Sequence, residues 1–433
     1  MPAVTAFKTN VTAIETHHVE TLAQQYDDFA AGKTRLLIAF RHPNSNDPYM
    51  LSHLFWRALP QTARQMGLKL GTPHAHFIYD RGIPLWAGSY LSWIFSHLGG
   101  VPIQRGKLDL RALKTARSLL LNGQFPLAAA PEGGNNGHNE IVSPLEPGIA
   151  QLAFWCAEDL QAAKRDQAVV ILPVGIQYRY IDPPWRQLEA LIHELEVDSG
   201  LQKEGLADIL KNSEWLEIGL PEQADLYRRL YRLAEHLLTL MEGYYHNFYG
   251  VSFEHSKLAS CPNERLAERL KALMDKALQV GEQYFNLRPK GSLIDRCRKL
   301  EQAGWSRIFR EDTISLTPVE LGLADRVAEE ANLRMWHMRL VESFVAVTGH
   351  YVKEHPSADR FAETTLLLRD MVGKIKGKTL SRPQLGQQRA ILTVGEPIEV
   401  SRRLADYKGK RRGAIAALTQ ELQTAMEALI VTE

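Results

Sequence analysis

Residues 35–50 read RLLIAFRHPNSNDPYM. The first six residues form a mostly apolar run of strand length, and the Pro-Asn-Ser-Asn segment at 43–46 is rich in turn-forming residues. Asp47 and Pro48 follow as a favourable pair for the first turn of a helix. The segment therefore predicts a strand, a turn and a helix in succession, which is the repeating pattern of an α/β fold.

The chain up to Tyr180 continues this alternation of strands and helices. Strand-like runs occur at 74–80, 101–104, 126–131 and 168–180, and helical segments occur at 49–58, 60–66, 85–98, 110–122 and 148–164. Helices that separate strands in this way imply right-handed crossovers and a parallel or mixed sheet.

The character of the sequence changes after Asp182. Residues 185–386 read as helix almost throughout and contain no convincing strand. Strand character returns at 390–400 and is followed by a helix at 412–430. Because this strand has no neighbour in its own part of the chain, we expect it to rejoin the N-terminal sheet.

The length of 433 residues also exceeds what one hydrophobic core usually organises. We therefore predict an α/β fold with a mixed sheet flanked by helices, interrupted by a large all-helical insertion. The expected parts are residues 1–182, the first part of the α/β domain; 183–387, the helical insertion; and 388–433, the C-terminal strand and helix of the α/β domain.

The composition is that of a globular protein of the cytoplasm. It is 45% hydrophobic and 23% charged, and its three cysteines, Cys156, Cys261 and Cys297, have no CxxC spacing. An odd number of scattered cysteines argues against a disulfide framework and against a zinc knuckle. The N-terminus shows no apolar run of signal-peptide length, so we expect no export signal.

Two segments bear on membranes. Residues 82–104 carry no charge, but prolines and glycines leave only 85–98 intact, which is shorter than the roughly 20 residues of a membrane span. We expect a buried or interfacial helix there, bearing Trp86, Tyr90, Trp93 and Phe95.

The second segment is basic. Residues 374–412 hold eleven basic residues against three acidic ones, a local balance of +8 within a chain whose net charge is +1. This stretch is either a solvated surface or a surface for anionic lipid headgroups. Nucleic-acid binding is disfavoured because aromatic residues are not interleaved with the basic ones.

The residues with the clearest chemical potential are His42 and Asp47. On a continuous helix two residues five apart would diverge by roughly 140°, so they meet only if a turn folds the carboxylate back onto the imidazole. In that geometry the carboxylate fixes the tautomer, and the other ring nitrogen removes a proton from a substrate hydroxyl. The alternative is that Asp47 caps a helix and His42 is an ordinary loop histidine.

Three further blocks lie at predicted strand ends. Arg105 follows a short strand in GGVPIQRGK (99–107), where a guanidinium suits phosphate, although it could be a surface arginine. Glu132-Gly133-Gly134 ends the strand in FPLAAAPEGGNNG (125–137), either as a tight turn or as a close backbone approach to a ligand. Pro173 lies within the buried strand VVILPVGIQY (169–178), where simple packing is the usual role.

Together and in this order, the four blocks resemble those of the phospholipid/glycerol acyltransferase family, the PlsC-like superfamily of 1-acylglycerol-3-phosphate acyltransferases. The resemblance covers about 36–180 and 388–433 and includes a family-like VGEPIEV segment at 394–400. The blocks read His42-PNSN-Asp47, Gly100-VPIQ-Arg105, Phe125-PLAAA-Pro131-Glu132-Gly133-Gly134 and Val170-IL-Pro173-Val174.

The resemblance implies an acyltransferase of acyl groups other than amino-acyl groups, in which the acceptor hydroxyl attacks an acyl thioester directly. His42 is then the general base and Asp47 orients it. Arg105, Glu132, Gly133 and Gly134 position a glycerol-phosphate-type acceptor, and Pro173 shapes the acyl side. No metal and no cofactor is implied, since the thioester of coenzyme A or of an acyl carrier protein is a co-substrate.

One departure leaves the acceptor open. The family usually has Thr or Gly, then Arg-Ser, after the Glu-Gly pair, whereas this chain has Gly134-Asn135-Asn136 and lacks that arginine. The leading acceptor is 1-acylglycerol 3-phosphate, and glycerol 3-phosphate or another lysolipid is the alternative. The expected partners are the donor, the acceptor, an anionic membrane surface and an acyl carrier protein, with no nucleic acid, for a cytoplasmic, peripherally membrane-associated protein.

Two other classes of function remain open. His74, His76 and Asp80 lie in one strand-like run, HAHFIYD, and histidines two apart share one face of a strand, as in some metallohydrolases. A non-catalytic lipid-binding protein is also possible, because the altered third block could reflect lost turnover. The absence of a G-x-S-x-G segment disfavours a serine lipase.

Overall fold

The computed structural model describes residues 9–84, 88, 90–104, 109–201, 221–253, 261–310, 312–347, 349–378 and 382–432. The chain divides into two compact units. The sheet unit comprises Met1–Ile181 and Gln387–Glu433, and the helical unit comprises Asp182–Gly386.

The sheet unit is built on an eight-stranded mixed sheet. Its strands follow the order β1-β7-β6-β2-β5-β3-β4, and β8 pairs with β6 beside this path. Neighbouring strands are parallel except for β6 with β7 and β6 with β8. The strands are β1 (Val11–His17), β2 (Thr34–Phe40), β3 (His76–Asp80), β4 (Gly100–Ile103), β5 (Leu127–Ala129), β6 (Ala168–Tyr180), β7 (Gln388–Val394) and β8 (Ile398–Glu399).

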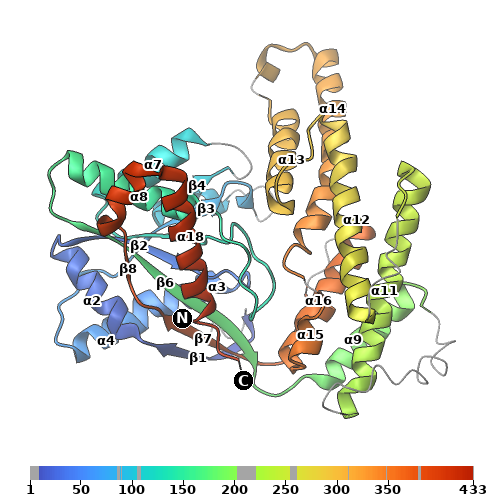
Figure 1. Ribbon diagram of the computed structural model, residues 1–433, viewed down its shortest axis with the longest axis horizontal. Coiled ribbons are helices and arrows are strands. Elements are labelled where there is room, and N and C mark those ends of the chain that lie inside the picture. The colour runs from blue at the N-terminus through green and yellow to red at the C-terminus, as the bar shows by residue number, and fades with distance from the viewer. Residues whose placement is uncertain are drawn as a thin grey trace. The chain divides into compact units, whose positions relative to one another are not determined.

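The strand that follows the helical unit completes this sheet. β7 pairs with β6 from Val174↔Val394 to Tyr180↔Gln388 and carries β1 along its other edge (Figure 1). The predicted mixed sheet with a helical interruption is therefore confirmed. Strand β1 was not expected, since its sequence VTAIETH is mostly exposed edge-strand residues rather than an apolar run.

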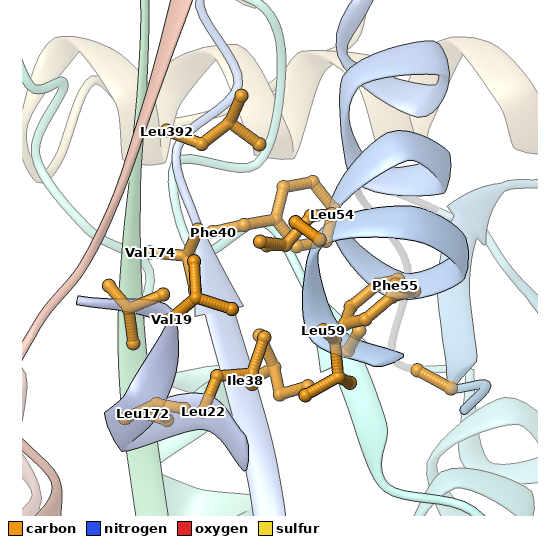
Figure 2. Packing of buried hydrophobic residues seen from close by; sticks show 14 of the residues in the cluster. Val19, Leu22, Ile38, Phe40, Leu54, Phe55, Leu59, Leu172, Val174 and Leu392 are labelled. Carbon is orange, nitrogen blue, oxygen red and sulfur yellow. The ribbon is translucent and has the colours of Figure 1, made fainter. Parts of the chain in front are cut away.

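Helices cover both faces of the sheet. One face carries α2 (Val19–Ala30), α3 (Asp47–His53) and α4 (Leu59–Gln65), and the other carries α7 (Leu110–Asn122), α8 (Gly148–Ala162) and α18 (Arg411–Glu427). β2 is buried along its whole length because its side chains alternate between the two resulting cores. Figure 2 shows the core on the face covered by α2, α3 and α4, where Ile38 and Phe40 of β2 pack with Leu54 and Leu59.

The helix after the His42 turn is longer than expected. The sequence predicts separate helices at 49–58 and 60–66, whereas α3 continues through the π-helical turn η1 (Leu54–Ala58) into α4. The N–H of Leu59 donates to Leu54 O, five residues earlier, just before Pro60, which has no N–H to donate. The widened turn thus carries the helix past the proline.

The remaining elements of the sheet unit are short. They are α6 (Tyr90–His97), the 3₁₀ turn η4 (Ser401–Arg403) and α17 (Leu404–Gly409). Among the described residues, no helix has the length and apolar character needed to cross a membrane.

The helical unit contains α9 (Trp185–Asp198), α11 (Pro221–Tyr249), α12 (Pro262–Tyr284), α13 (Leu293–Ile308), η3 (Asp312–Ser315), α14 (Pro318–Glu342), α15 (Tyr351–Glu354) and α16 (Ala358–Ile375). Helix α14 packs on both α12 and α13. Its start is fixed by a capping box, in which Thr317 and Glu320 bond each other's backbone N–H groups.

A buried tyrosine–histidine pair lies inside this unit. The Tyr245 hydroxyl lies 2.7 Å from His337 Nδ1, with Tyr249 and Trp336 packed around the imidazole. Burial, assisted by the nearby Arg334 charge, lowers the pKa of His337 to about 4. The histidine is therefore neutral in the folded protein at pH 7.

We expect this histidine to make stability pH-dependent. Its folded pKa lies below the unfolded value of about 6.5, so the unfolded chain binds the proton first and stability falls as pH drops from about 6.5 towards 4, by on the order of 3 kcal/mol. Urea unfolding at pH 7 and pH 5, followed by circular dichroism, measures the part of this loss, about 2 kcal/mol, that is reached by pH 5. His337→Gln is expected to be less stable at pH 7 but to lose less on acidification; an equal loss in both proteins would contradict the assignment.

Candidate active site

The site begins where β2 leaves the sheet. Beyond Phe40, the N–H of Arg41 still donates to Val174 O at 2.9 Å, and the chain then turns out of the sheet at His42. Asp47 N donates to Asn44 O at 3.2 Å, while Asn44 N donates to the Asp47 carboxylate at 3.1 Å. These two bonds close the turn and return Asp47, the first residue of α3, to the strand end.

The turn brings the two predicted catalytic side chains into contact. Asp47 Oδ2 lies 2.7 Å from His42 Nδ1. The carboxylate is fully buried, whereas 28% of the His42 side chain is exposed. Because Nδ1 faces the carboxylate, Nε2 is the ring nitrogen that can meet a substrate hydroxyl.

A third group, Tyr178 of β6, contacts the same carboxylate. Its hydroxyl donates to Asp47 Oδ1 at 2.5 Å. Burial raises the pKa of Asp47, and the bonds from His42, Tyr178 and Asn44 oppose that rise. Burial and the neighbouring carboxylate raise the pKa of Tyr178 well above its usual value, so the phenol keeps its proton and is the donor.

Glu132 supports the other side of His42. Its Oε1 accepts from the backbone N–H of His42 at 3.0 Å, and its Oε2 accepts from Asn136 Nδ2 and Ser143 N, each at 2.9 Å. The carboxylate is buried. Glu132 therefore holds the His42 backbone against the loop that follows β5.

The glycine after Glu132 allows that loop to turn. Gly133 has φ 71°, a left-handed conformation that disfavours residues with a Cβ, and its N–H donates to Ala130 O at 3.3 Å. Gly134 follows it in the chain, half-buried. The predicted Glu-Gly-Gly block thus forms a tight turn directly beside His42.

A buried arginine organises the same loop. Arg41 donates to the carbonyl oxygens of Asn139 at 2.5 Å, His138 at 3.1 Å and Ile141 at 2.6 Å, and its Nε lies 3.7 Å from Glu132 Oε1. Its side chain is fully buried. Arg41 was not predicted from the sequence, although a charge placed directly after an apolar strand and beside His42 was a usable signal.

Comparison with known proteins bears on this geometry. Residues 13–177 match the family model described as Acyltransferase, a range that includes His42, Asp47 and Glu132. Residues 13–177 thus form an acyltransferase-family segment, called the acyltransferase domain below. The expected PlsC-like resemblance is confirmed over this range, and with it the expectation of an acyltransferase enzyme. No curated protein and no solved structure matches the chain.

Arg105 and Pro173 are the two remaining predicted site residues. Arg105 lies outside the described residues. Pro173 lies in β6 opposite Ala39, and strand alternation directs its ring to the face opposite Val174 and Tyr178. There it packs on Gly395, where a Cβ would lie 2.9 Å from the ring.

The histidines considered as metal ligands have structural contacts in the acyltransferase domain. His74 Nε2 lies 2.8 Å from Leu98 O, and His76 Nδ1 lies 3.2 Å from Gly99 O. Both rings therefore hold the turn before β4. The described part of the chain contains no group of three or more His, Cys, Asp or Glu residues that could hold a metal ion.

Helix α6 is an apolar surface element of the acyltransferase domain. None of its residues is buried, and Tyr90 and Trp93 are 62% and 65% exposed. Phe95 attaches the helix to β3, with its ring centroid 4.8 Å from that of Tyr79. Trp86, which was expected in the same helix, lies outside the described residues.

The basic stretch is divided between the two units, and six of its eleven basic residues form ion pairs. Residues 374–386 belong to the helical unit and 387–412 to the sheet unit. This arrangement favours an ordinary solvated surface over a concentrated patch for anionic lipid. The ion pairs are Lys376–Asp198, Arg382–Asp370, Arg389–Glu15, Arg402–Glu399, Arg403–Glu421 and Arg411–Glu158.

Proposed function

We propose that the protein transfers a fatty acyl group from an acyl thioester to a hydroxyl of a glycerol-phosphate-type acceptor, with 1-acylglycerol 3-phosphate as the leading candidate. The observation that supports this most directly is the 2.7 Å contact between the buried Asp47 carboxylate and the part-exposed imidazole of His42. The pair lies within the segment that matches the acyltransferase family model.

The chemistry follows from the roles of the two ring nitrogens. His42 Nε2 removes the proton from the acceptor hydroxyl as its oxygen attacks the thioester carbonyl carbon. The carbon–sulfur bond then breaks, and the leaving thiolate takes the proton back from the imidazolium. Asp47 stabilises the imidazolium through Nδ1–H, and the ester and the free thiol leave with His42 neutral again.

The other predicted site residues position His42 and the substrates. Glu132 acts through the His42 backbone, because both of its oxygens accept bonds from protein groups. The turn at Gly133 and Gly134 allows a bound acceptor to approach the backbone closely, and Arg105 supplies a cation for the acceptor phosphate. Pro173 contributes to the acyl side only indirectly, through the strand that carries it. The thioester, of coenzyme A or an acyl carrier protein, is a co-substrate, and no cofactor takes part.

A product-identification assay tests this function. The full-length protein is incubated with acyl-coenzyme A or acyl-carrier-protein thioester and with glycerol 3-phosphate, 1-acylglycerol 3-phosphate or a lysolipid whose phosphate is esterified, and products are identified by mass. We expect a diacylglycerol 3-phosphate and one equivalent of free thiol. Vesicle or lysolipid binding without thiol release from any pair would instead support the non-catalytic lipid-binding alternative.

We also propose that this is a cytoplasmic protein that meets the membrane peripherally through α6. Aromatic side chains that combine an apolar ring with a polar tip, such as Tyr90 and Trp93, favour the membrane–water interface. The three cysteines are free, which fits a reducing compartment.

Loss of these two rings is expected to weaken vesicle binding. The double variant Tyr90→Ser, Trp93→Ser removes apolar area worth about 25 cal/mol per Å², which corresponds to at least about a tenfold lower partition coefficient in vesicle sedimentation. Phe248→Ser, at a residue 75% exposed in the helical unit, is the matched control. Equal binding by wild type and the double variant would remove α6 from the lipid surface. Because six of the eleven basic residues in 374–412 are ion-paired, raised salt should release only part of the protein.

A further inference from the structure

Tyr178 takes part in a buried chain of hydrogen bonds that ends at the imidazole. Its hydroxyl donates to Asp47 Oδ1 at 2.5 Å, and Asp47 Oδ2 lies 2.7 Å from His42 Nδ1. The Tyr178 side chain is fully buried, as is that of Asp47. The only ordinary way to satisfy a phenol O–H beside a carboxylate is donation to that carboxylate.

The contacts fix the plane of the carboxylate. Asp47 Oδ2 accepts from the Asn44 N–H as well as facing His42, so the turn and the imidazole hold one oxygen. The Tyr178 hydroxyl holds the other oxygen. A carboxylate restrained at both oxygens cannot rotate about its Cβ–Cγ bond without breaking a buried hydrogen bond.

The backbone of Tyr178 is held on both sides. Tyr178 lies in β6, where it is paired with Ala390 of β7. On the other side its backbone N–H donates to Asn139 Oδ1 at 2.7 Å, and Arg41 binds the carbonyl oxygen of Asn139. The same loop therefore braces Tyr178 and, through Glu132, the backbone of His42.

We propose that Tyr178 is a positioning residue for acyl transfer: its hydroxyl orients Asp47 so that Oδ2 receives the Nδ1 proton of His42 and Nε2 remains free to act as the base. This proposal rests on the proposed role of His42 as general base. It assigns a function to a strand residue that has no direct contact with the imidazole and that lies just beyond the matched segment.

The hydroxyl also divides the Asp47 charge between two donors. Without it, the carboxylate charge acts more strongly on His42, so the protonated imidazole is favoured and the base is formed only at higher pH. Other charged groups near the site are Glu132, on the His42 backbone, Arg41 beside Glu132, and the buried Arg179–Glu140 ion pair in the strand and the loop that hold Tyr178. None of them hydrogen-bonds the phenol, so all act equally in wild type and variant.

The test is Tyr178→Phe against the matched control Tyr407→Phe. Tyr407 is also buried in the sheet unit, and its hydroxyl lies 2.9 Å from Gln151 Nε2, so its loss removes a buried hydroxyl elsewhere. We expect Tyr178→Phe to lower kcat about 10–100-fold with little change in acceptor KM, and to move the acid limb of the kcat profile up by about half a pH unit or more. Tyr407→Phe should change neither.

A second substitution keeps the shape of the ring. Site-specific 3,5-difluorotyrosine at position 178 is a stronger donor, and it should move the acid limb in the opposite direction, to lower pH. ¹⁵N spectra of His42 give a readout besides activity: the pH at which imidazolium signals give way to neutral-imidazole signals should move up in Tyr178→Phe and down in the fluorinated protein.

The outcomes separate this inference from the proposed function. If the wild type transfers acyl groups and His42→Ala does not, but Tyr178→Phe matches Tyr407→Phe in kcat, pH profile and ¹⁵N titration, the role of Tyr178 is refuted. If the fluorinated protein and Tyr178→Phe shift the acid limb in the same direction, the proposed charge sharing is wrong. If His42→Ala remains active, the proposed function itself fails.

Discussion

Replacing His42 with alanine is expected to reduce acyl transfer by about 10²–10⁴-fold, the usual contribution of a general base. The loss should appear in kcat, because the imidazole is needed when the acceptor hydroxyl is deprotonated rather than when the lipid binds. Thiol release from the acyl thioester, measured with saturating acceptor, reports it directly. The fold should persist, since part of the His42 side chain is exposed and removing it opens no core cavity.

His53→Ala is the matched control for this variant. His53 ends α3, the helix that begins at Asp47, and it is likewise only half-buried. The His53→Ala protein should turn over at nearly the wild-type rate. Near-normal turnover of His42→Ala, with unchanged circular dichroism, would contradict general base catalysis by this residue.

Asp47→Asn is expected to cause a loss of similar size, about 10²–10⁴-fold in kcat, for a geometric reason. The Tyr178 hydroxyl and the Asn44 N–H compete for the one carbonyl oxygen that an asparagine would keep. If Tyr178 holds it, the amide NH₂ points at His42 Nδ1, where it favours an imidazole that carries its proton on Nε2. That tautomer cannot accept a proton at Nε2.

Asp159→Asn provides the comparison for the charge change. Asp159 lies in the sheet unit, where its carboxylate pairs with Arg117 at 2.6 Å on the surface of α7 and α8. Its loss should leave kcat and acceptor KM unchanged. An Asp47→Asn protein that folds, binds acceptor and retains more than about a tenth of wild-type kcat would show that the carboxylate does not select the His42 tautomer.

The sequence was informative where the fold depends on local pattern. Apolar runs in the sequence predicted strands β2 and β6. The strand predicted at 390–400 has no other strand near it in the sequence, so a partner elsewhere in the chain was expected, and that partner is β6. Strand β1 was missed because an edge strand buries little. The π-helical turn before Pro60 depends on packing of the whole helix, which no local pattern records.

Part of the candidate site was also predictable from local sequence, and part of it was not. The five-residue spacing of His42 and Asp47, with four turn residues between them, was enough to predict their contact. Tyr178 lies 131 residues from Asp47 in the chain, so only the pairing of β2 with β6 reveals their hydrogen bond. Strand alternation did contain a weak signal, because Val174, Ile176 and Tyr178 share one face of β6.

The placement of β7 has a consequence for how the chain is made. β1 is the first strand of this sheet to leave the ribosome, and in the finished sheet it pairs with β7, the strand that also covers the edge of β6. About 200 residues of the helical unit are synthesised in between, which takes on the order of 10–40 s at about 5–20 residues per second. During that interval both β1 and one edge of β6 have unpaired backbone groups, while the helical unit can already close its own core. β1 can therefore pair with β7 only after the helical unit, whose contacts are local and form quickly, has been synthesised.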